Sequence, residues 1–217
     1  WNVLPGQGTY YAPDFKTPKG LVPGTPGEYV TEAVVNKSIE WLKNGRDKEK
    51  PFMLMVQHKA PHRFWLPPVH LLEEYTNKNY PEPKSLLDDY KGRGTPANTQ
   101  DMTLRETMDL ALDNKMVPFR QDRMNEAQRK QWNKVYDGIR ADVLKKRPQG
   151  DDLVRWKYQR YMADYLACIK SLDESVGTML DYLDEAGLAD DTVVIYASDQ
   201  GFFLGEHGWF DKRFMYE

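Results

Sequence analysis

The sequence predicts an α/β fold in which a mostly parallel sheet is flanked by helices. Two apolar runs, residues 52–56 and 192–197, have the composition of strands that are buried on both faces, as in a parallel sheet covered by helices. A helical pattern precedes each run, at residues 29–44 and 151–186, with only a short link between. Because a helix followed at once by a buried strand is half of a βαβ unit, both parts of the chain predict the same architecture.

The composition is that of a globular domain of ordinary size. Of the 217 residues, 40% are apolar and 29% are charged, which suits a substantial core. The net charge of -3 provides no basic field for a nucleic-acid partner. The apolar runs are far shorter than the roughly 20 residues of a membrane-spanning helix, so no membrane span is expected. The first residues do not have the charged-then-apolar pattern of a leader, and we expect any export signal to have been removed or to lie outside these residues.

The predicted elements follow one another within a single domain. Residues 1–28 are rich in glycine and proline, which excludes a regular helix and predicts a loop. The helix at residues 29–44 has apolar side chains at near-helical spacing and ends at Gly45, a typical residue after a helix. A buried strand at residues 52–57 comes next.

Residues 63–150 are predicted to be an insertion at the ligand edge of the sheet. Prolines divide this region into short pieces, with helical candidates at residues 69–75, 104–112 and 125–146. The last candidate combines high charge with scattered aromatic residues, which predicts a surface helix. Residues 151–217 then carry a long helix, the second strand and a segment of candidate metal ligands.

Side chains suited to chemistry follow the second apolar run. Asp199 and Gln200 come at its carboxyl end, the edge at which open α/β sheets bind ligands. Glu206, His207 and Lys212 follow closely. Carboxylate and amide oxygens suit a hard divalent cation such as Ca²⁺, and an ammonium group suits an anionic substrate. The residues alone equally allow Asp199 to be a turn residue after a strand.

A second polar group follows the first apolar run and contains His58, Lys59, His62 and Arg63. A histidine with a pKa near 6.5 can donate or accept a proton close to neutral pH. On the residues alone, His62 is also compatible with a plain loop position.

Both groups resemble motifs of one enzyme family. The segments Ser198-Asp-Gln-Gly, Leu204-Gly-Glu-His-Gly and Asp211-Lys-Arg-Phe-Met-Tyr-Glu resemble the second metal-binding segment of the type I, formylglycine-dependent sulfatases. The segment Pro51-Phe-Met-Leu-Met-Val-Gln-His-Lys-Ala-Pro-His-Arg resembles the family's strand and Pro-His element. The branch of closest resemblance contains N-acetylglucosamine-6-sulfatases and related glycosaminoglycan sulfatases. Two separate motifs in the family's order are more specific than either alone.

The resemblance implies an alkaline-phosphatase-like fold and hydrolysis of a sulfate ester on a sugar. The residues matching Asp199 and Gln200 are metal ligands in the family, although asparagine or histidine is more frequent than glutamine there. His62 matches a residue that binds the ester and can protonate the departing alcohol oxygen. Lys212 matches a lysine that holds a sulfate oxygen. Candidates for gripping the sugar or its anionic groups are His58, Lys59, Arg63, Trp65, His207 and Arg213.

The resemblance also implies a sulfated carbohydrate as partner and a periplasmic, secreted or lysosomal location. Two parts of the family pattern are missing: a pair of adjacent aspartates, and the Cys- or Ser-x-Pro/Ala-x-Arg sequence whose first residue becomes formylglycine. Neither occurs before Gly45, and Cys168 lacks the Pro/Ala and Arg that should follow it. We therefore expect an internal piece of a longer catalytic domain, inactive alone, with the formylglycine outside these residues.

Two alternatives stay open at this point. A metal-dependent phosphoesterase or phosphonate hydrolase of the same superfamily could share the aspartate after the strand, although two-metal members need further Asp and His ligands, and the chain has only four histidines. A non-catalytic carbohydrate-binding module could instead stack sugars on aromatic side chains, with Tyr10, Tyr11, Trp65, Trp209 and Phe210 as the candidates.

Overall fold

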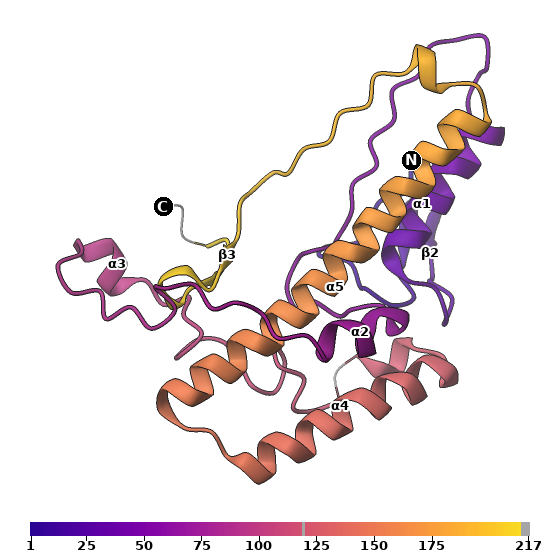
Figure 1. Cartoon of the computed structure of the whole chain (residues 1–217). Coiled ribbons are helices and arrows are strands. Elements are labelled where there is room, and N and C mark those ends of the chain that lie inside the picture. Colours follow the sequence, from indigo (N-terminus) through magenta and orange to yellow (C-terminus); the bar gives the residue numbers. More distant parts are fainter. Residues whose placement is uncertain (119, 214–217) are drawn as a thin grey trace.

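Helix α5 (Gly150–Glu185) is the axis along which the other elements are arranged (Figure 1). The computed structural model describes residues 1–118 and 120–213. The other helices are α1 (Val30–Glu40), α2 (Leu72–Thr76), α3 (Thr95–Thr99) and α4 (Glu126–Lys146), and the strands are β1 (Phe15–Thr17), β2 (Gly20–Val22), β3 (Phe203–Leu204) and β4 (Phe210–Asp211). Among the described residues, no helix is both long enough and apolar enough to cross a lipid bilayer.

The long helix predicted at residues 151–186 is confirmed and is unbroken over 36 residues. It ends where Gly187 takes a left-handed φ of 63°. The Gly187 N–H donates to the carbonyl of Asp184 (3.0 Å) and the Leu188 N–H to that of Leu183 (2.8 Å), so the last carbonyls of the helix are satisfied.

Helices α1 and α4 confirm two further predictions. Helix α1 continues through a π-helical turn to Gly45, the expected end. Helix α4 begins with reciprocal hydrogen bonds between Asn125 and Gln128, in which each side chain accepts the other's backbone N–H. Its aromatic residues Trp132 and Tyr136 are fully buried, so α4 is not the plain surface helix that its charge suggested. The charged residues cover one face and the aromatic residues pack beneath.

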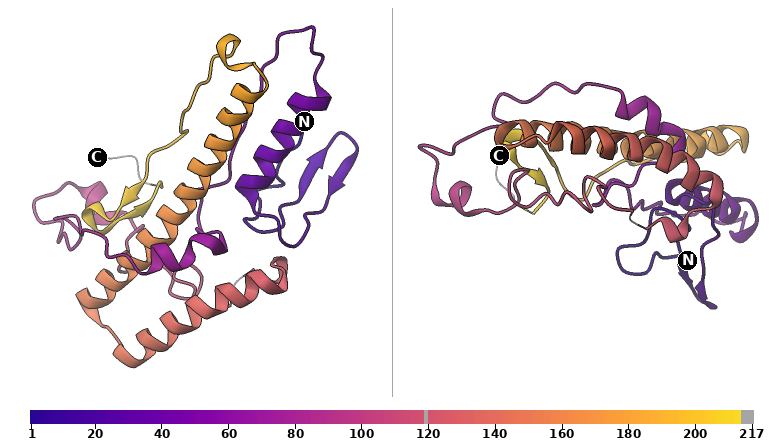
Figure 2. Two further views of the ribbon diagram at one scale, coloured as in Figure 1. Left: turned by 45° about the vertical axis from the view of Figure 1, so that its right-hand side comes forward. Right: turned by 90° about the horizontal axis from the view of Figure 1, so that it is seen from below.

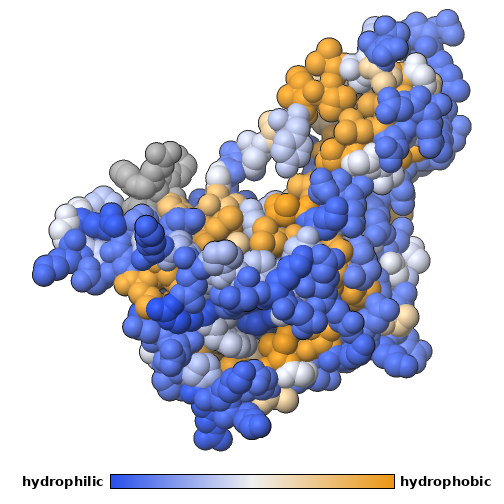
Figure 3. Space-filling model, in the orientation of Figure 1, coloured by the Kyte–Doolittle hydropathy of each residue, from blue (hydrophilic) through white to orange (hydrophobic). Residues whose placement is uncertain are grey.

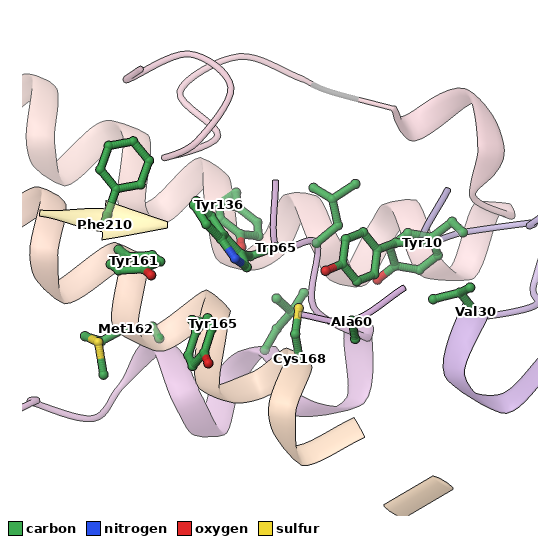
Figure 4. Close-up of a cluster of buried hydrophobic side chains, with 14 of the residues drawn as sticks. Tyr10, Val30, Ala60, Trp65, Tyr136, Tyr161, Met162, Tyr165, Cys168 and Phe210 are labelled. Carbon is green, nitrogen blue, oxygen red and sulfur yellow. The ribbon is translucent and has the colours of Figure 1, made fainter. Parts of the chain in front are cut away.

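Aromatic side chains dominate the core around α5 (Figure 4). Trp132 stacks on Tyr136 with ring centres 4.5 Å apart, and Trp65 lies 4.7 Å from Tyr161. Such pairs contribute roughly 0.5–1.5 kcal/mol each beyond their buried area. This core joins α4 and α5 to the loop that follows residues 52–57.

The predicted parallel sheet does not form among the described residues. Residues 52–57 and 193–197 run as extended segments away from one end of α5, and neither pairs with a described strand (Figures 1 and 2). The two sheets that do form are antiparallel two-stranded pairs, β1 with β2 and β3 with β4. Helices and small sheets are present as the coarser prediction requires, but the described residues do not confirm the parallel sheet, because neither segment has a neighbouring strand there.

The unpaired segments expose apolar side chains. Val193 is 88% exposed and Ile195 83%, and Met53 and Met55 are also exposed. Figure 3 shows apolar residues gathered at the end of the molecule where these segments meet α5. A contiguous exposed apolar surface marks a region that another surface covers.

Two local details differ from the sequence predictions. The loop at residues 1–28 contains the β1–β2 hairpin, with Phe15 opposite Val22. Residues 104–112 form single turns instead of a helix. The N–H groups of Thr107 and Met108 both donate to the carbonyl of Thr103, and those of Asp113 and Asn114 both donate to the carbonyl of Asp109. The N–H of Asp109 donates to the carboxylate of Asp113 (2.8 Å), which replaces a helical hydrogen bond.

Candidate functional site

His62 lies in the turn after residues 52–57, and hydrogen bonds hold it on both sides. Its N–H donates to the carbonyl of Lys59 (2.9 Å), and its carbonyl accepts the hydroxyl of Tyr10 (2.6 Å). Its ring Nδ1 lies 2.7 Å from the carbonyl oxygen of Arg63. Because a carbonyl can only accept, Nδ1 carries the proton, and Nε2 is the atom left to exchange a proton with a substrate.

Charged groups from the other motif lie within electrostatic reach of His62. Burial lowers the pKa of His62 below its usual value, while the hydrogen bond to the Arg63 carbonyl raises it. The positive charges of Lys59 and Lys212 lower this pKa further, and the negative charge of Asp211 opposes them. The structure therefore brings the two predicted catalytic residues, from opposite ends of the chain, into one electrostatic neighbourhood.

Lys59 is held beside this histidine. Its Nζ donates to the carbonyl of Gln7 (2.7 Å) and lies 5.0 Å from the ring centre of Tyr10. Burial lowers the pKa of Lys59 to about 8, with further lowering by Arg120 and Lys212. Lys59 is thus a cation at neutral pH and loses its charge as the pH rises through about 8.

Lys212 follows β4, and the preceding residue holds its backbone. Oδ1 of Asp211 accepts the N–H of Lys212 (2.9 Å), and Oδ2 of Asp211 lies 3.5 Å from Nε of Arg213. Asp211 is fully buried, whereas the Lys212 side chain is partly exposed. The Lys212 ammonium forms no ion pair with any of the described carboxylates and is available to an anion. The remainder of its motif, Phe214 to Glu217, lies outside the described residues.

The β3–β4 hairpin that presents Lys212 needs glycine at its turn. Gly205 has a φ of 102°, a conformation that side-chain-bearing residues rarely adopt. A Cβ added there would lie 2.6 Å from the ring of Tyr158. Gly205 therefore allows the hairpin to pack closely against Tyr158 of α5.

His207 is engaged with the protein itself. Its Nδ1 lies 2.7 Å from Oδ2 of Asp88, its N–H donates to Oγ of Ser85, and its carbonyl accepts the Tyr90 hydroxyl. Although burial raises the pKa of Asp88, hydrogen bonds from His207 and Arg93 bring it down to about 2. These contacts anchor the β3–β4 hairpin to residues 85–90.

Arg63 and Trp65 also make internal contacts. The guanidinium of Arg63 forms two hydrogen bonds to the buried carboxylate of Asp113, at 2.7 and 2.5 Å. Burial would lower the pKa of Arg63, but the pairing with Asp113 raises it. Trp65 is fully buried among Tyr161 and Phe210. Trp65 therefore presents no surface to a sugar, and its predicted role is corrected to packing.

The remaining sugar-binding candidates differ in their surroundings. Burial lowers the pKa of His58 to about 4, so its ring is neutral near pH 7, and its Nδ1 has no hydrogen-bond partner among the described residues. Arg213 is half exposed and lines an open hollow of about 450 Å³. The other lining residues are Thr95, Pro96, Thr99, Gln100, Asp101 and Met102.

Asp199 and Gln200 lie at the end of the second extended segment and are exposed. Neither side chain has a hydrogen bond or ion pair to a described residue. Ser198 Oγ instead turns the backbone by donating to the carbonyl of Gln200 (2.7 Å). In the part of the chain that the structure describes, no three His, Cys, Asp or Glu side chains are grouped to hold a metal ion. Two adjacent hard oxygen donors suit a cation that takes its other ligands from elsewhere.

The aromatic residues of the carbohydrate-binding alternative are all buried. Tyr10 and Tyr11 are each 2% exposed, and Trp65, Trp209 and Phe210 are 3% exposed or less. Because sugar stacking needs an open ring face, these five side chains do not support a binding module.

Three acidic residues of the site escaped the sequence analysis: Asp88, Asp113 and Asp211. Asp88 and Asp113 are held by His207 and Arg63, which are distant in the sequence, and Asp211 accepts the N–H of the next residue. No local sequence pattern distinguishes these three residues from surface aspartates. Asp211 stood within a recognised motif, so its position next to Lys212 was the one available signal.

Comparisons with known proteins identify the family of this chain. A sequence model of the sulfatase family matches residues 2–214. The chain is 42% identical to an N-acetylglucosamine-6-O-sulfatase of Bacteroides thetaiotaomicron, over all of this chain and 41% of that protein. It is 29% identical to an arylsulfatase of Clostridium perfringens, over 86% of this chain and 29% of that protein.

A solved structure supports the same relationship. The structure of BT4656 in complex with its substrate D-glucosamine-2-N,6-O-disulfate superimposes with a TM-score of 0.94 and 42% identity, over all of this chain and 47% of that chain. The chain thus spans less than half the length of these relatives. The family match over residues 2–214 and the 42% identity along the whole chain establish that this chain belongs to the sulfatase family.

Proposed function

We propose that the protein containing this chain hydrolyses a sulfate ester on a sugar of the N-acetylglucosamine-6-sulfate or glycosaminoglycan type. The observation that carries the proposal is that the positive charges of Lys59 and Lys212 both lower the pKa of His62, in a chain 42% identical to an N-acetylglucosamine-6-O-sulfatase. The substrate of the similar solved structure carries a 6-O-sulfate on glucosamine, so a 6-sulfated glucosamine is the substrate to test first.

Each of these residues is assigned a role in this proposal. The Lys212 ammonium binds a sulfate oxygen and stabilises the charge that develops in the transition state. His62, with its ring oriented by the Nδ1–H, acts in its imidazolium form: Nε2–H gives its proton to the departing sugar oxygen as the sulfur–oxygen bond breaks, and the ring is left neutral with its proton on Nδ1. Lys59 adds a second positive charge and favours the anionic group over a neutral one. Arg213 and His58 are candidates for contacts to the rest of the sugar.

Asp199 and Gln200 are proposed to supply two ligands to a divalent cation such as Ca²⁺, with the others outside this chain. Their free oxygen atoms and exposed position fit this role. The cation would polarise the sulfate oxygens, and a formylglycine elsewhere in the protein would supply the attacking oxygen. Cys168 does not suit the role of the attacking group, because its side chain is fully buried. Burial also raises the pKa of its thiol to about 12, so it is not a reactive thiolate.

The exposed segments support a further part of this proposal. We infer that residues 52–57 and 193–197 are strands of a parallel sheet whose neighbouring strands lie in other parts of the protein. Their apolar side chains are exposed, and no described strand pairs with their backbone groups. An apolar extended segment with unpaired N–H and C=O groups is a template for another strand.

Hydrogen exchange tests this inference. In the full-length protein, we expect the amides of residues 52–57 and 193–197 to be strongly protected, and in the isolated chain to exchange rapidly. Helix α5 serves as the protected reference and the exposed residues Gly6 and Gln7 as the freely exchanging one. Rapid exchange of both segments in the full-length protein would contradict the inference.

The proposed activity has a direct test in the full-length protein. We expect peptide mass spectrometry to find formylglycine, and an assay to detect sulfate release from a 6-sulfated glucosamine. A phosphate monoester tested in parallel is expected to be a much poorer substrate, which separates sulfatase from phosphoesterase activity. Absence of both formylglycine and sulfate release would reject the proposal.

A further inference from the structure

A chain of charged groups runs from the His62 turn into the core. Arg63 pairs with Asp113, whose backbone carbonyl accepts a hydrogen bond from Nζ of Lys115 (2.7 Å). Lys115 in turn pairs with Asp164 on α5 at 2.6 Å. The side chains of Asp113, Lys115 and Asp164 are at most 1% exposed.

The far end of this network is fixed by two helices. Oδ1 of Asp164 accepts the hydroxyl of Tyr136 on α4 (2.7 Å) and Nη2 of Arg160 on α5 (3.2 Å). The carbonyl of Lys115 accepts Nε of Arg140 on α4 (2.8 Å). The segment that carries Asp113 is therefore attached to residues of both α4 and α5.

The near end of the network reaches His62 through a single residue. The Arg63 side chain forms a bidentate salt bridge with Asp113, and the Arg63 carbonyl oxygen lies 2.7 Å from Nδ1 of His62. The Arg63 guanidinium also lies 5.2 Å from the ring centre of Phe210, the first residue of β4. One arginine thus contacts the ring of His62, a buried carboxylate and the strand that presents Lys212.

Stability alone does not account for such a network. Burying charged groups removes them from water, and a buried ion pair is often no more stabilising than apolar side chains of the same size. A two-pronged pair between arginine and carboxylate does fix orientation, because the planar guanidinium matches the carboxylate in one geometry.

We propose that Asp113 is a positioning residue that, through Arg63, orients the ring of His62 for proton transfer to the departing sugar oxygen. Asp113 does not contact the substrate in this role. The proposal rests on the proposed function of His62 and extends it to a residue in the region least readable from the sequence. It also reassigns Arg63 from gripping the sugar to holding the histidine.

The test compares two sulfate esters in the full-length protein with Asp113→Asn. For a 6-sulfated glucosamine, whose departing alcohol needs a proton, we expect kcat to fall by about 10- to 100-fold with KM changed by less than about twofold. For nitrophenyl sulfate, whose departing group is stable as an anion, we expect a much smaller loss. Arg63→Lys retains the charge but loses the two-pronged geometry, and the same selective loss is expected.

Asp151→Asn is the matched control, because it breaks the exposed Arg105–Asp151 pair in the same region. Its kinetics are expected to equal those of the wild type on both esters. Equal losses on both esters in the two test variants, or an unchanged kcat in a folded Asp113→Asn protein, would overturn the proposal. If Asp113→Asn does not fold, the same comparison of the two esters with Arg63→Lys tests the proposal.

A second measurement separates this proposal from the proposed function. Nitrogen NMR of the His62 ring reports which nitrogen carries the proton, whether or not the protein hydrolyses sulfate. We expect a single tautomer with the proton on Nδ1 in the wild type and a mixture in Asp113→Asn. An unchanged tautomer in the variant would reject the positioning role. Absence of sulfatase activity in the wild type would reject the proposed function alone.

Discussion

Replacing Lys212 with alanine in the full-length protein is expected to lower kcat/KM for a 6-sulfated glucosamine by about 10²- to 10³-fold. The structure leaves this ammonium without an ion pair to any described carboxylate, close enough to His62 to lower the pKa of that residue. Removing it takes away a fixed positive charge from the place where negative charge develops. Steady-state assays of sulfate release measure the effect.

The matched control for Lys212→Ala is Lys50→Ala, because Lys50 is a well-exposed lysine that pairs with Asp47. Its activity is expected to equal that of the wild type. The Lys212 variant should also raise the pKa of His62, since the positive charge that opposes the imidazolium form has gone. An activity within about twofold of the wild type would rule out a role for Lys212 in binding the transferring group.

The second large effect is expected from Asp199→Asn. An amide in place of the carboxylate retains one oxygen but removes the negative charge, so a divalent cation is held more weakly. We expect the purified full-length variant to contain far less bound divalent metal and to lose activity by at least about 10²-fold. Elemental analysis measures the metal independently of activity.

Asp190→Asn is the control for this experiment, because Asp190 is an exposed carboxylate close by in the sequence. It should retain the metal content of the wild type. Added Ca²⁺ is expected to restore part of the activity of Asp199→Asn, since affinity rather than geometry is impaired. A variant with full metal content and full activity would assign Asp199 to the turn that the residues alone also allowed.

Local sequence signals predicted the three long helices α1, α4 and α5, but not the short helix α3. The glycine at position 45 and the apolar spacing of α5 act within a few residues, so they are visible in the sequence itself. The turns at residues 104–112 were missed because their hydrogen bonds depend on Asp113, whose conformation is fixed by Arg63, fifty positions away.

In the candidate site, too, the sequence showed what local motifs reveal and missed what contacts between distant residues decide. The motifs identified His62 and Lys212 because their order and spacing are visible in the sequence. Trp65, His207 and Arg63 were grouped with them because they are close in sequence. The structure instead shows that one is buried and that two pair with distant carboxylates.

By itself, the sequence determined the three long helices, the positions of two apolar extended segments and the residue types available for chemistry, because these depend on neighbours within a few turns of chain. Only the tertiary structure decided which charged side chains are free and which are paired. Asp113 and Asp211 become special through burial, which is a property of the whole packed chain. Strand pairing also depends on the tertiary structure, since a strand needs a neighbouring strand, which the described residues do not supply.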